Sequence, residues 1–429
     1  MRCSHQTHFL IVGAGAAGLM AARELARAGK RVTILEARER CGGRIYPLRA
    51  EEFGYAAEGG AEFVHGAAAV TRALMREARL SLSPLQGSHW NVRRGVFSPD
   101  WSPPPHAGRF RQALKELKTD LPVAEFLETH FAGQRYDELR RRITRMVEGY
   151  DAADPCRAST LVLRDEWLGR ELGQQGRIQE GYGALIEYLV SECRRCGVAI
   201  HPGAVVTAID ARGEGIAARC RDGAVLEADA AILTVPLPIL PEISLPPAAS
   251  EKARLANNDI GFGNVVKILL RFTTTWWAEH GGQDLADLSF MSSNATVPTW
   301  WTQYPAGYPV LTGWFAGPKA DRVEQLTATE LVEMGLDSLA EIFNLPVDRI
   351  TMDLVASQAI NWGYDPFARG AYSYATPKTR DAQSMLKKPN SAAIFFSGEA
   401  LYAGPDMGTV EAALASGQET AQTILAAGL

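Results

Sequence analysis

The stretch FLIVGAGAAG at residues 9–18 decides the fold of this chain. Its first four residues are an apolar run typical of a buried parallel strand, and the triplet Gly13, Gly15 and Gly18 follows directly. A helical pattern comes next, and a second apolar run ends just before Glu36. This order of strand, glycine turn, helix and strand predicts a βαβ unit.

The glycines and the acidic residue each have a physical task in binding a dinucleotide. Gly13 permits the tight turn, Gly15 lets a diphosphate approach the helix N-terminus, and Gly18 allows helix and strand to pack closely. Glu36 lies close to the ~20-residue spacing at which an acidic side chain meets the ribose 2′-hydroxyl of adenosine. Because a carboxylate there would repel a 2′-phosphate, the pattern disfavours NADP.

Two further glycine-rich turns indicate which dinucleotide is bound. They are EARERCGGR at residues 36–44 and EGGAEFVHG at residues 58–66, and nicotinamide enzymes seldom need them. The glycine triplet followed by these turns resembles the N-terminal motif of the flavin amine oxidase family. The stretch NWGYDPFARGAYSY at residues 361–374 resembles the same family, above all its lysine-demethylase and polyamine-oxidase branch. The resemblance covers both ends and the middle of the chain.

The resemblance implies that FAD is the cofactor. No cysteine lies just before Gly398, where monoamine oxidases attach their flavin, so non-covalent binding is expected. The resemblance also implies that Glu36 binds the ribose and that Val206 pairs with adenine through its backbone. A helix beginning near Gly408 would direct its positive end at the flavin ring and stabilise the reduced, anionic form. The residues expected to bind the cofactor are Gly13, Gly15, Ala17, Gly18, Glu36, Ala37, Arg38, Gly43, Arg44, Gly60, Ala61, Glu62, Phe63, Val206, Thr234, Gly398, Glu399, Gly408, Thr409 and Val410.

Three residues are expected at the reacting end of the cofactor: Lys267, Tyr372 and Trp362. Residue type alone does not decide Lys267, because alternation along its strand also allows a lysine that faces solvent. In the family a lysine in this sequence context is bridged by water to flavin N5. Tyr372 would form an aromatic wall beside the flavin. Monoamine oxidases have a second tyrosine where this chain has Thr409, so the opposing wall is Trp362, another residue, or absent.

The length of the chain favours two domains. At 429 residues it exceeds what one hydrophobic core usually supports. The resemblance implies an α/β fold in which a Rossmann-like FAD-binding domain of the GR2 type is interleaved with an α+β substrate-binding domain. The FAD-binding domain would comprise residues 1–80, 180–237 and 390–429, and the substrate-binding domain residues 81–179 and 238–389.

Composition and charge exclude several classes of protein. The chain is 46% hydrophobic and 22% charged, as in ordinary globular proteins, and its formal net charge is -5. A negative chain without a cationic block is a poor partner for nucleic acid or for an anionic membrane surface. The first residues contain no apolar leader and no stretch is long enough to span a bilayer, so a cytoplasmic location is expected.

The cysteines and the basic run add no prediction of function. The six cysteines are scattered, which predicts free thiols. Cys193 and Cys196 have redox spacing, but they end an amphipathic helical pattern and no second pair accompanies them, so no metal site is expected. The arginine run at residues 140–142 is interpreted as the solvated face of a helix.

The reaction implied by the resemblance is oxidation of a CH-NH or CH-NH2 group by an amine oxidase. Hydride would move from the α-carbon of a neutral amine to flavin N5, the imine would hydrolyse to a carbonyl product, and O2 would reoxidise the flavin to give hydrogen peroxide. Three alternatives stay open: an amine dehydrogenase with another electron acceptor, a flavin desaturase, and a non-catalytic flavin-binding module. The class of the amine also stays open: it is a polyamine, an aromatic amine, a cyclic amine or an amino acid. Whether the protein forms a homodimer stays open as well.

Overall fold

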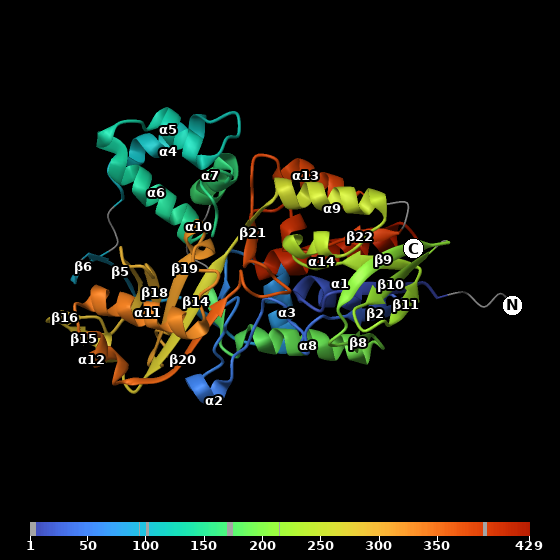
Figure 1. Ribbon diagram of the computed structural model, residues 1–429, viewed down its shortest axis with the longest axis horizontal. Coiled ribbons are helices and arrows are strands. Elements are labelled where there is room, and N and C mark those ends of the chain that lie inside the picture. The colour runs from blue at the N-terminus through green and yellow to red at the C-terminus, as the bar shows by residue number, and fades with distance from the viewer. Residues whose placement is uncertain (1–5, 94, 100–102, 170–174, 214, 389–392) are drawn as a thin grey trace.

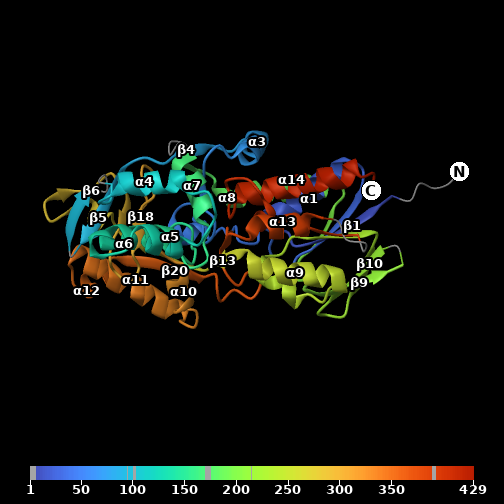
Figure 2. The same ribbon diagram turned by 90° about the horizontal axis from the view of Figure 1, so that it is seen from above.

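The computed structural model describes residues 6–93, 95–99, 103–169, 175–213, 215–388 and 393–429. Two halves lie next to each other along the long axis of the molecule, and each is built on its own β-sheet (Figures 1 and 2). The mixed α/β architecture predicted from the sequence is confirmed.

The half on the right of Figure 1 contains a five-stranded parallel sheet in the order β22-β12-β1-β2-β8. Its strands are β1 (His8–Val12), β2 (Arg31–Leu35), β8 (Ala199–His201), β12 (Ala230–Leu233) and β22 (Ile394–Phe396). In β1, Phe9 and Ile11 pack in one hydrophobic core, while Leu10 and Val12 pack in another. A strand buried on both faces needs a continuous apolar run rather than an alternating one. The predicted βαβ unit is therefore confirmed.

Different layers cover the two faces of this sheet. One face carries helices, of which α1 and α14 lie side by side in Figure 2. These helices are α1 (Ala16–Arg27), α3 (Ala69–Ala78), α8 (Gly181–Arg195) and α14 (Val410–Ala426). The other face packs against an antiparallel sheet and helix α9. These elements are β9 (Val206–Arg212), β10 (Gly215–Cys220), β11 (Val225–Ala228) and α9 (Pro247–Asp259).

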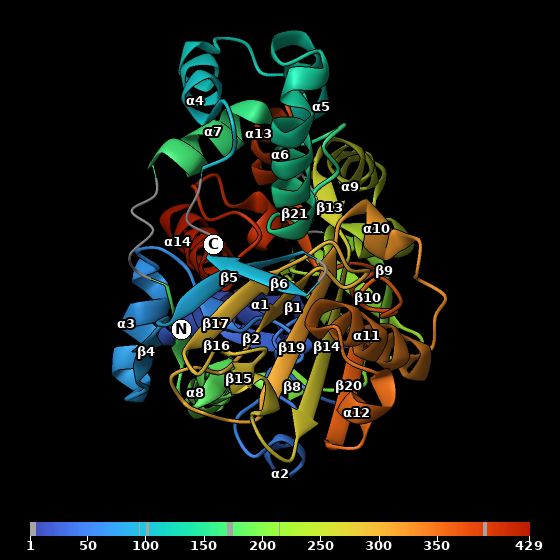
Figure 3. The ribbon, with the colours of Figure 1, turned by 90° about the vertical axis from the view of Figure 1, so that its left-hand side faces the viewer.

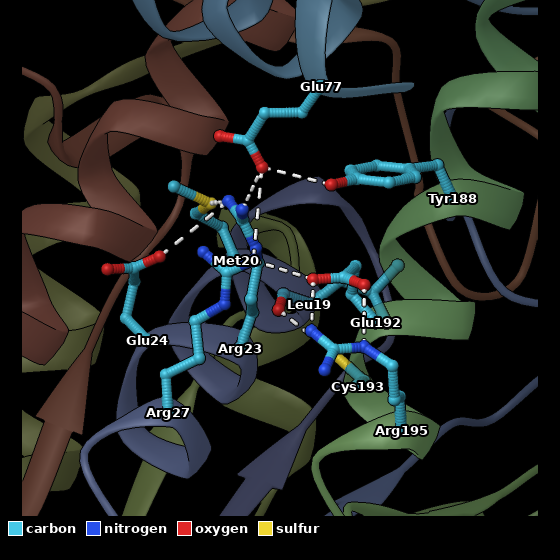
Figure 4. A network of polar contacts seen from close by, with 10 residues as sticks. All are labelled: Leu19, Met20, Arg23, Glu24, Arg27, Glu77, Tyr188, Glu192, Cys193 and Arg195. Atoms are coloured by element: carbon cyan, nitrogen blue, oxygen red, sulfur yellow. Dashed lines mark hydrogen bonds and ion pairs between the residues drawn. The ribbon is translucent and has the colours of Figure 1, made fainter. Parts of the chain in front are cut away.

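A polar network fixes helix α1, whose first turn contains the last glycine of the motif (Figure 4). Arg23 of α1 is buried and forms an ion pair with Glu77 of α3. Tyr188 of α8 donates its hydroxyl to the same carboxylate at 2.9 Å, and Arg27 of α1 pairs with Glu192 of α8 at 2.6 Å. Three helices are thus joined through their side chains, which holds the N-terminus of α1 in place at the carboxyl edge of the sheet.

The other half contains a seven-stranded sheet in the order β20-β14-β19-β18-β17-β5-β6. All neighbours are antiparallel except β17 and β5. The strands are β5 (Ser88–Arg93), β6 (Val96–Pro99), β14 (Val265–Phe272), β17 (Leu288–Ser292), β18 (Thr299–Trp301), β19 (Val310–Ala316) and β20 (Leu354–Asn361). Helix α11 (Ala328–Phe343) packs on one face through a shared core.

The pleat of β14 determines which way Lys267 faces. Val266 and Ile268 belong to the core under α11, so Lys267, between them, points to the opposite face. Lys267 lies opposite Trp314 of β19 and Ile360 of β20 in the register. Its side chain is only 1% exposed. The sequence left a solvent-facing lysine open, and the structure excludes it.

A bundle of four helices lies above the antiparallel sheet in Figures 1 and 3. The helices are α4 (Ala107–Glu116), α5 (Val123–His130), α6 (Asp137–Gly149) and α7 (Thr160–Gly169). Phe110, Phe126 and Phe131 form a small separate core in the bundle. The bundle thus has its own hydrophobic interior and presents α6 toward the sheet.

The remaining elements are short or lie in connections. They are α2 (Ala50–Phe53), β3 (Phe63–Val64), β4 (Leu82–Pro84), η1 (Gln134–Tyr136), β7 (Gly176–Ile178), η2 (Leu237–Glu242), β13 (Gly261–Gly263), η3 (Trp276–Ala278), β15 (Glu279–His280), β16 (Gln283–Asp284), α10 (Pro318–Asp321), α12 (Val347–Thr351), β21 (Tyr372–Tyr374), α13 (Thr379–Lys387) and η4 (Glu399–Leu401). Within the described residues, each helix falls short of the length and apolar content that crossing a membrane requires. The cysteines of the described ranges are free thiols, as predicted.

Candidate functional site

A cavity of about 1140 Å³ joins the two halves of the molecule. At one end it is lined by Val12 and Leu35, the last residues of two parallel strands. At the other end it is lined by Lys267, Trp301 and Trp314 of the antiparallel sheet. Ligands of open α/β sheets bind at the carboxyl ends of the strands. The volume exceeds that of most small-molecule pockets, about 300–1,000 Å³, so the cavity has room for a large cofactor together with a substrate.

The structure brings the predicted site residues together. Every predicted cofactor-binding and catalytic residue except Gly18 lines this cavity. Gly18 packs within the turn instead, because an added Cβ would lie 2.0 Å from the carbonyl oxygen of Gly13. Its contribution is the close packing that the glycine motif requires of its last position.

The nucleotide end of the cavity is built by the turn between β1 and α1. Gly13 has a φ of +108°, and a Cβ at Gly15 would meet no atom within 4 Å. The N-terminus of α1 is therefore open to the cavity at Gly15. Glu36 is 3% exposed, and its carboxylate accepts hydrogen bonds from the amides of Ala14 at 2.7 Å and Arg38 at 2.9 Å. These bonds fix an acceptor beside the open turn.

The arginines of the second glycine-rich turn bind protein partners at the cavity wall. Arg44 donates to Glu399 and to the carbonyl of Ala371, each at 2.8 Å. Arg38 forms an ion pair with Asp365 and its guanidinium lies 5.4 Å from the centre of the Phe367 ring. The turn near the N-terminus is thereby held to stretches more than three hundred residues further along the chain.

The positive end of helix α14 lies at the cavity wall. Gly408, Thr409 and Val410 line the cavity there. Thr409 is the N-cap residue, and its hydroxyl oxygen accepts the amide of Ala412 at 3.2 Å. Thr409 therefore caps a helix whose N-terminus, and hence the positive end of whose dipole, lies at the cavity wall.

Aromatic side chains enclose the opposite end of the cavity. Trp362 donates its ring nitrogen to the carbonyl of Gly59 at 3.2 Å, and Tyr372 donates its hydroxyl to the carbonyl of Tyr150 at 2.8 Å. The Tyr372 ring is nearly parallel to that of Trp314, with centroids 6.5 Å apart. Burial raises the pKa of Tyr372 well above its ordinary value, so the phenol stays neutral. We call Phe63, Trp301, Trp314, Trp362 and Tyr372 the aromatic chamber.

Lys267 forms an ion pair inside this end of the cavity. Its Nζ donates to Glu62 at 2.7 Å and to the carbonyl of Gly60 at 3.2 Å, and it lies 5.5 Å from the centre of the Trp301 ring. Arg177 donates to the other oxygen of Glu62 at 2.8 Å. Although burial acts to raise the pKa of Glu62, the cations Lys267 and Arg177 lower it to about 2. The carboxylate is therefore ionised despite its burial.

Comparison with known proteins identifies the family of this chain. The sequence model of the family described as flavin containing amine oxidoreductase matches residues 16–425. The chain belongs to this family. The family resemblance drawn from the glycine turns and the 361–374 stretch is confirmed.

Curated relatives of this flavin-containing oxidoreductase fall in two groups. It is 26% identical to the human lysine-specific histone demethylase 2 in an alignment that covers 92% of the chain and 51% of the demethylase. It is 28% identical to polyamine oxidase 2 of Arabidopsis thaliana in an alignment that covers 91% of the chain and 82% of that oxidase. The chain thus spans about half the length of the demethylase.

Solved structures resemble the whole fold. A cyclohexylamine oxidase from Brevibacterium oxydans has a TM-score of 0.79 at 19% identity, covering 98% of this chain and 99% of that one. A putrescine oxidase bound to putrescine has a TM-score of 0.80 at 20% identity, with the same coverage. At these identities the likeness is evidence of the fold, and the predicted Rossmann-like architecture is confirmed.

The residues of the cavity fit FAD, the cofactor of this flavin-containing family. Gly15 and Gly398 both line the cavity, and a Cβ at either position would project into open space. The missing side chains leave the backbone accessible to a diphosphate. Glu36 offers a buried acceptor beside one end, and the aromatic chamber lies at the other. An elongated cofactor with a polar end and a flat aromatic end matches this distribution.

Some residues of the site were not predicted from the sequence. Arg177 and Gln303 bind Glu62, and neither stands in a recognisable motif. Trp301 lines the cavity and donates its ring nitrogen to Glu62 as well, at 3.1 Å. Arg141 and Arg142, interpreted as a solvated helix face, line the cavity. Arg141 is exposed, as expected of a solvated helix face, and Arg142 is half-buried at the cavity wall.

Glu58 is a second buried carboxyl group near Lys267. One oxygen accepts the amide of Gly183 at 3.1 Å, while the other is buried without a hydrogen-bond partner among the described residues. Burial raises the pKa of Glu58 from 4.5 to about 7. Because the folded pKa lies above the unfolded one, folding favours the protonated form. The stabilisation is complete below about pH 4.5 and is lost as the pH rises through about 7.

We expect Glu58→Gln to abolish this pH dependence. A shift of this size corresponds to about 3 kcal/mol, so the variant should gain about that much over the wild type between about pH 4.5 and pH 7.5. Urea unfolding of both proteins across this range measures the difference. Glu51→Gln, at an exposed position on α2, is the control and should show no such gain. A stability difference between Glu58→Gln and the wild type that does not change with pH would contradict the raised pKa of Glu58.

Proposed function

We propose that this protein is an FAD-dependent amine oxidase. The observation that carries the proposal is the juxtaposition, at one end of the cavity, of the aromatic chamber and a buried lysine in a chain of the flavin-containing amine oxidoreductase family. When bound, FAD supplies the acceptor for two electrons and the α-hydrogen of the amine, and passes the electrons to O2 to yield hydrogen peroxide. The imine left from the amine hydrolyses to a carbonyl compound and ammonia or a smaller amine.

The protein's own residues orient the reactants and exclude water. The aromatic chamber surrounds the substrate with apolar surface, which favours the neutral form of an amine because a charged ammonium would lose its hydration. Tyr372 stays neutral and is hydrogen-bonded to Tyr150, so it serves as a rigid wall. Lys267 supplies positive charge where the reaction delivers electrons.

A set of amines mixed with the FAD-loaded protein tests the proposal. Without oxygen, at least one polyamine, aromatic, cyclic amine or amino acid should bleach the flavin absorption band. Admitting air should then restore the band and release one hydrogen peroxide per flavin reduced. If no amine bleaches a fully loaded flavin, the proposed activity is wrong.

The same experiment separates an oxidase from a dehydrogenase. The positively charged ammonium of Lys267 at the reacting end favours electron transfer to oxygen, and we therefore expect the band to recover in air within seconds. Recovery that requires an added electron acceptor would identify the protein as a dehydrogenase instead. Polyenes are the control substrates, and bleaching by them would indicate a desaturase.

A further inference from the structure

The hydrogen bonds of Lys267 to the described residues leave one of its three protons without a partner. An ammonium group has three donors. Two are used, by the carboxylate of Glu62 at 2.7 Å and the carbonyl of Gly60 at 3.2 Å. Lys267 also lines the cavity. One N–H therefore remains for a group inside the cavity, with the other two holding the ammonium in a fixed place.

Glu62 is held from several sides at once. One oxygen accepts from Arg177, Trp301 and Gln303, at 2.8, 3.1 and 3.1 Å. The other accepts from Lys267 at 2.7 Å and from the Trp301 ring nitrogen at 3.2 Å. A carboxylate has about four lone-pair sites, so the described residues fill the hydrogen-bonding capacity of this one.

The elements behind Glu62 also fix its position. Glu62 directly precedes strand β3, which pairs with β7, the strand that carries Arg177. The guanidinium of Arg177 also donates to the carbonyl of Thr302 at 3.0 Å and lies 4.7 Å from the centre of the Phe63 ring. The group contains one buried cation, Lys267, one half-buried cation, Arg177, and one carboxylate, so these three side chains keep an excess of positive charge beside the aromatic chamber.

We propose that Glu62 is a positioning residue that holds Lys267 as a fixed ammonium at the reacting end of the cavity, with Arg177 keeping Glu62 ionised. Lys267 then donates a hydrogen bond and supplies charge, and does not act as a base. The inference rests on the proposed function because it takes the flavin ring to bind at the aromatic chamber. It requires only that FAD is bound, not that a particular amine is oxidised.

The absorption spectrum of bound FAD reports on the charge of Lys267. In Glu62→Gln, Lys267 and Arg177 would face each other without a counter-charge, and a buried lysine in that setting loses its proton at a lower pH. With Glu58, whose pKa is about 7, replaced by glutamine in every protein compared, we expect the spectrum to stay constant from about pH 6 to pH 9 when Glu62 is intact, and Glu62→Gln to show a one-proton step inside that range. The double variant with Lys267→Met should lose the step.

Glu411→Gln is the matched control. Glu411 is also a buried carboxylate, and it accepts hydrogen bonds from Val70 and Thr71 at 2.7–2.9 Å, but it does not line the cavity. Its spectrum should stay constant across the same pH range. A constant spectrum in Glu62→Gln with bound FAD would overturn the proposal, and so would a step that persists after Lys267 is replaced.

The variant Glu62→Asp tests the proposal if Glu62→Gln does not fold or does not bind FAD. Glu62→Asp keeps the charge but withdraws it by one methylene from Lys267, so a smaller step in the same direction is expected. A spectrum identical to the wild type would then overturn the proposal. If the FAD spectrum of the variant does not change with pH but the variant still oxidises amines, only the inferred role of Glu62 is rejected. If the spectrum shows the pH-dependent step but no amine bleaches the flavin, only the proposed function is rejected.

Discussion

Replacing Lys267 by methionine will slow the reoxidation of the reduced enzyme by oxygen roughly 100-fold, while FAD binding is retained. Methionine preserves most of the side-chain volume and removes the charge. Electron transfer to oxygen builds negative charge next to the aromatic chamber, and a fixed cation in a water-poor site stabilises such charge far more than in water. Stopped-flow mixing of the reduced protein with oxygenated buffer measures the rate.

Lys319→Met is the control for the loss of one positive charge. Lys319 is about half exposed and pairs with Glu148 at 3.1 Å, away from the cavity lining. Its replacement should leave the reoxidation rate unchanged. Reoxidation of Lys267→Met at the wild-type rate would remove Lys267 from this step. If Glu62 acts as inferred, Glu62→Gln should approach the slow rate of Lys267→Met as the pH rises.

The turn at the nucleotide end could be predicted because it depends on neighbours in the sequence. The fold of residues 9–18 follows from the glycines themselves: Gly13 needs a positive φ and Gly18 has no space for a side chain. The same holds for Glu36, which binds the amides of Ala14 and Arg38 within its own βαβ unit. Local geometry sufficed for this end of the site.

The charge cluster at the reacting end could not be predicted, since its members meet only through strand pairing. Lys267 and Glu62 are 205 residues apart, and Arg177 and Glu62 are 115 apart. Their contact depends on the register of β14 in one sheet and on the pairing of β3 with β7 in another. The family resemblance assigned a role to Lys267, but the sequence contained no signal for its partner.

Two alanine substitutions in the glycine motif should separate folding from cofactor binding. Gly18→Ala places a methyl group 2.0 Å from the carbonyl oxygen of Gly13 and 2.9 Å from the hydroxyl of Thr234. Neither neighbour can withdraw without opening the turn between β1 and α1, so we expect a loss of stability of about 4 kcal/mol or more. Thermal unfolding of the protein without FAD measures this loss.

Gly15→Ala should instead lower FAD affinity and leave the stability of the protein without FAD unchanged. Its methyl group meets no protein atom within 4 Å, so the protein without FAD should unfold at the wild-type temperature. The methyl group would occupy the space through which a diphosphate approaches the helix N-terminus, so FAD affinity should fall at least about 10-fold, or about 1.4 kcal/mol. Gly108→Ala, which also has open space but lies in α4 away from the cavity, should leave FAD affinity unchanged. Wild-type FAD affinity in Gly15→Ala would mean that the diphosphate binds elsewhere, because no other property of the turn would have changed.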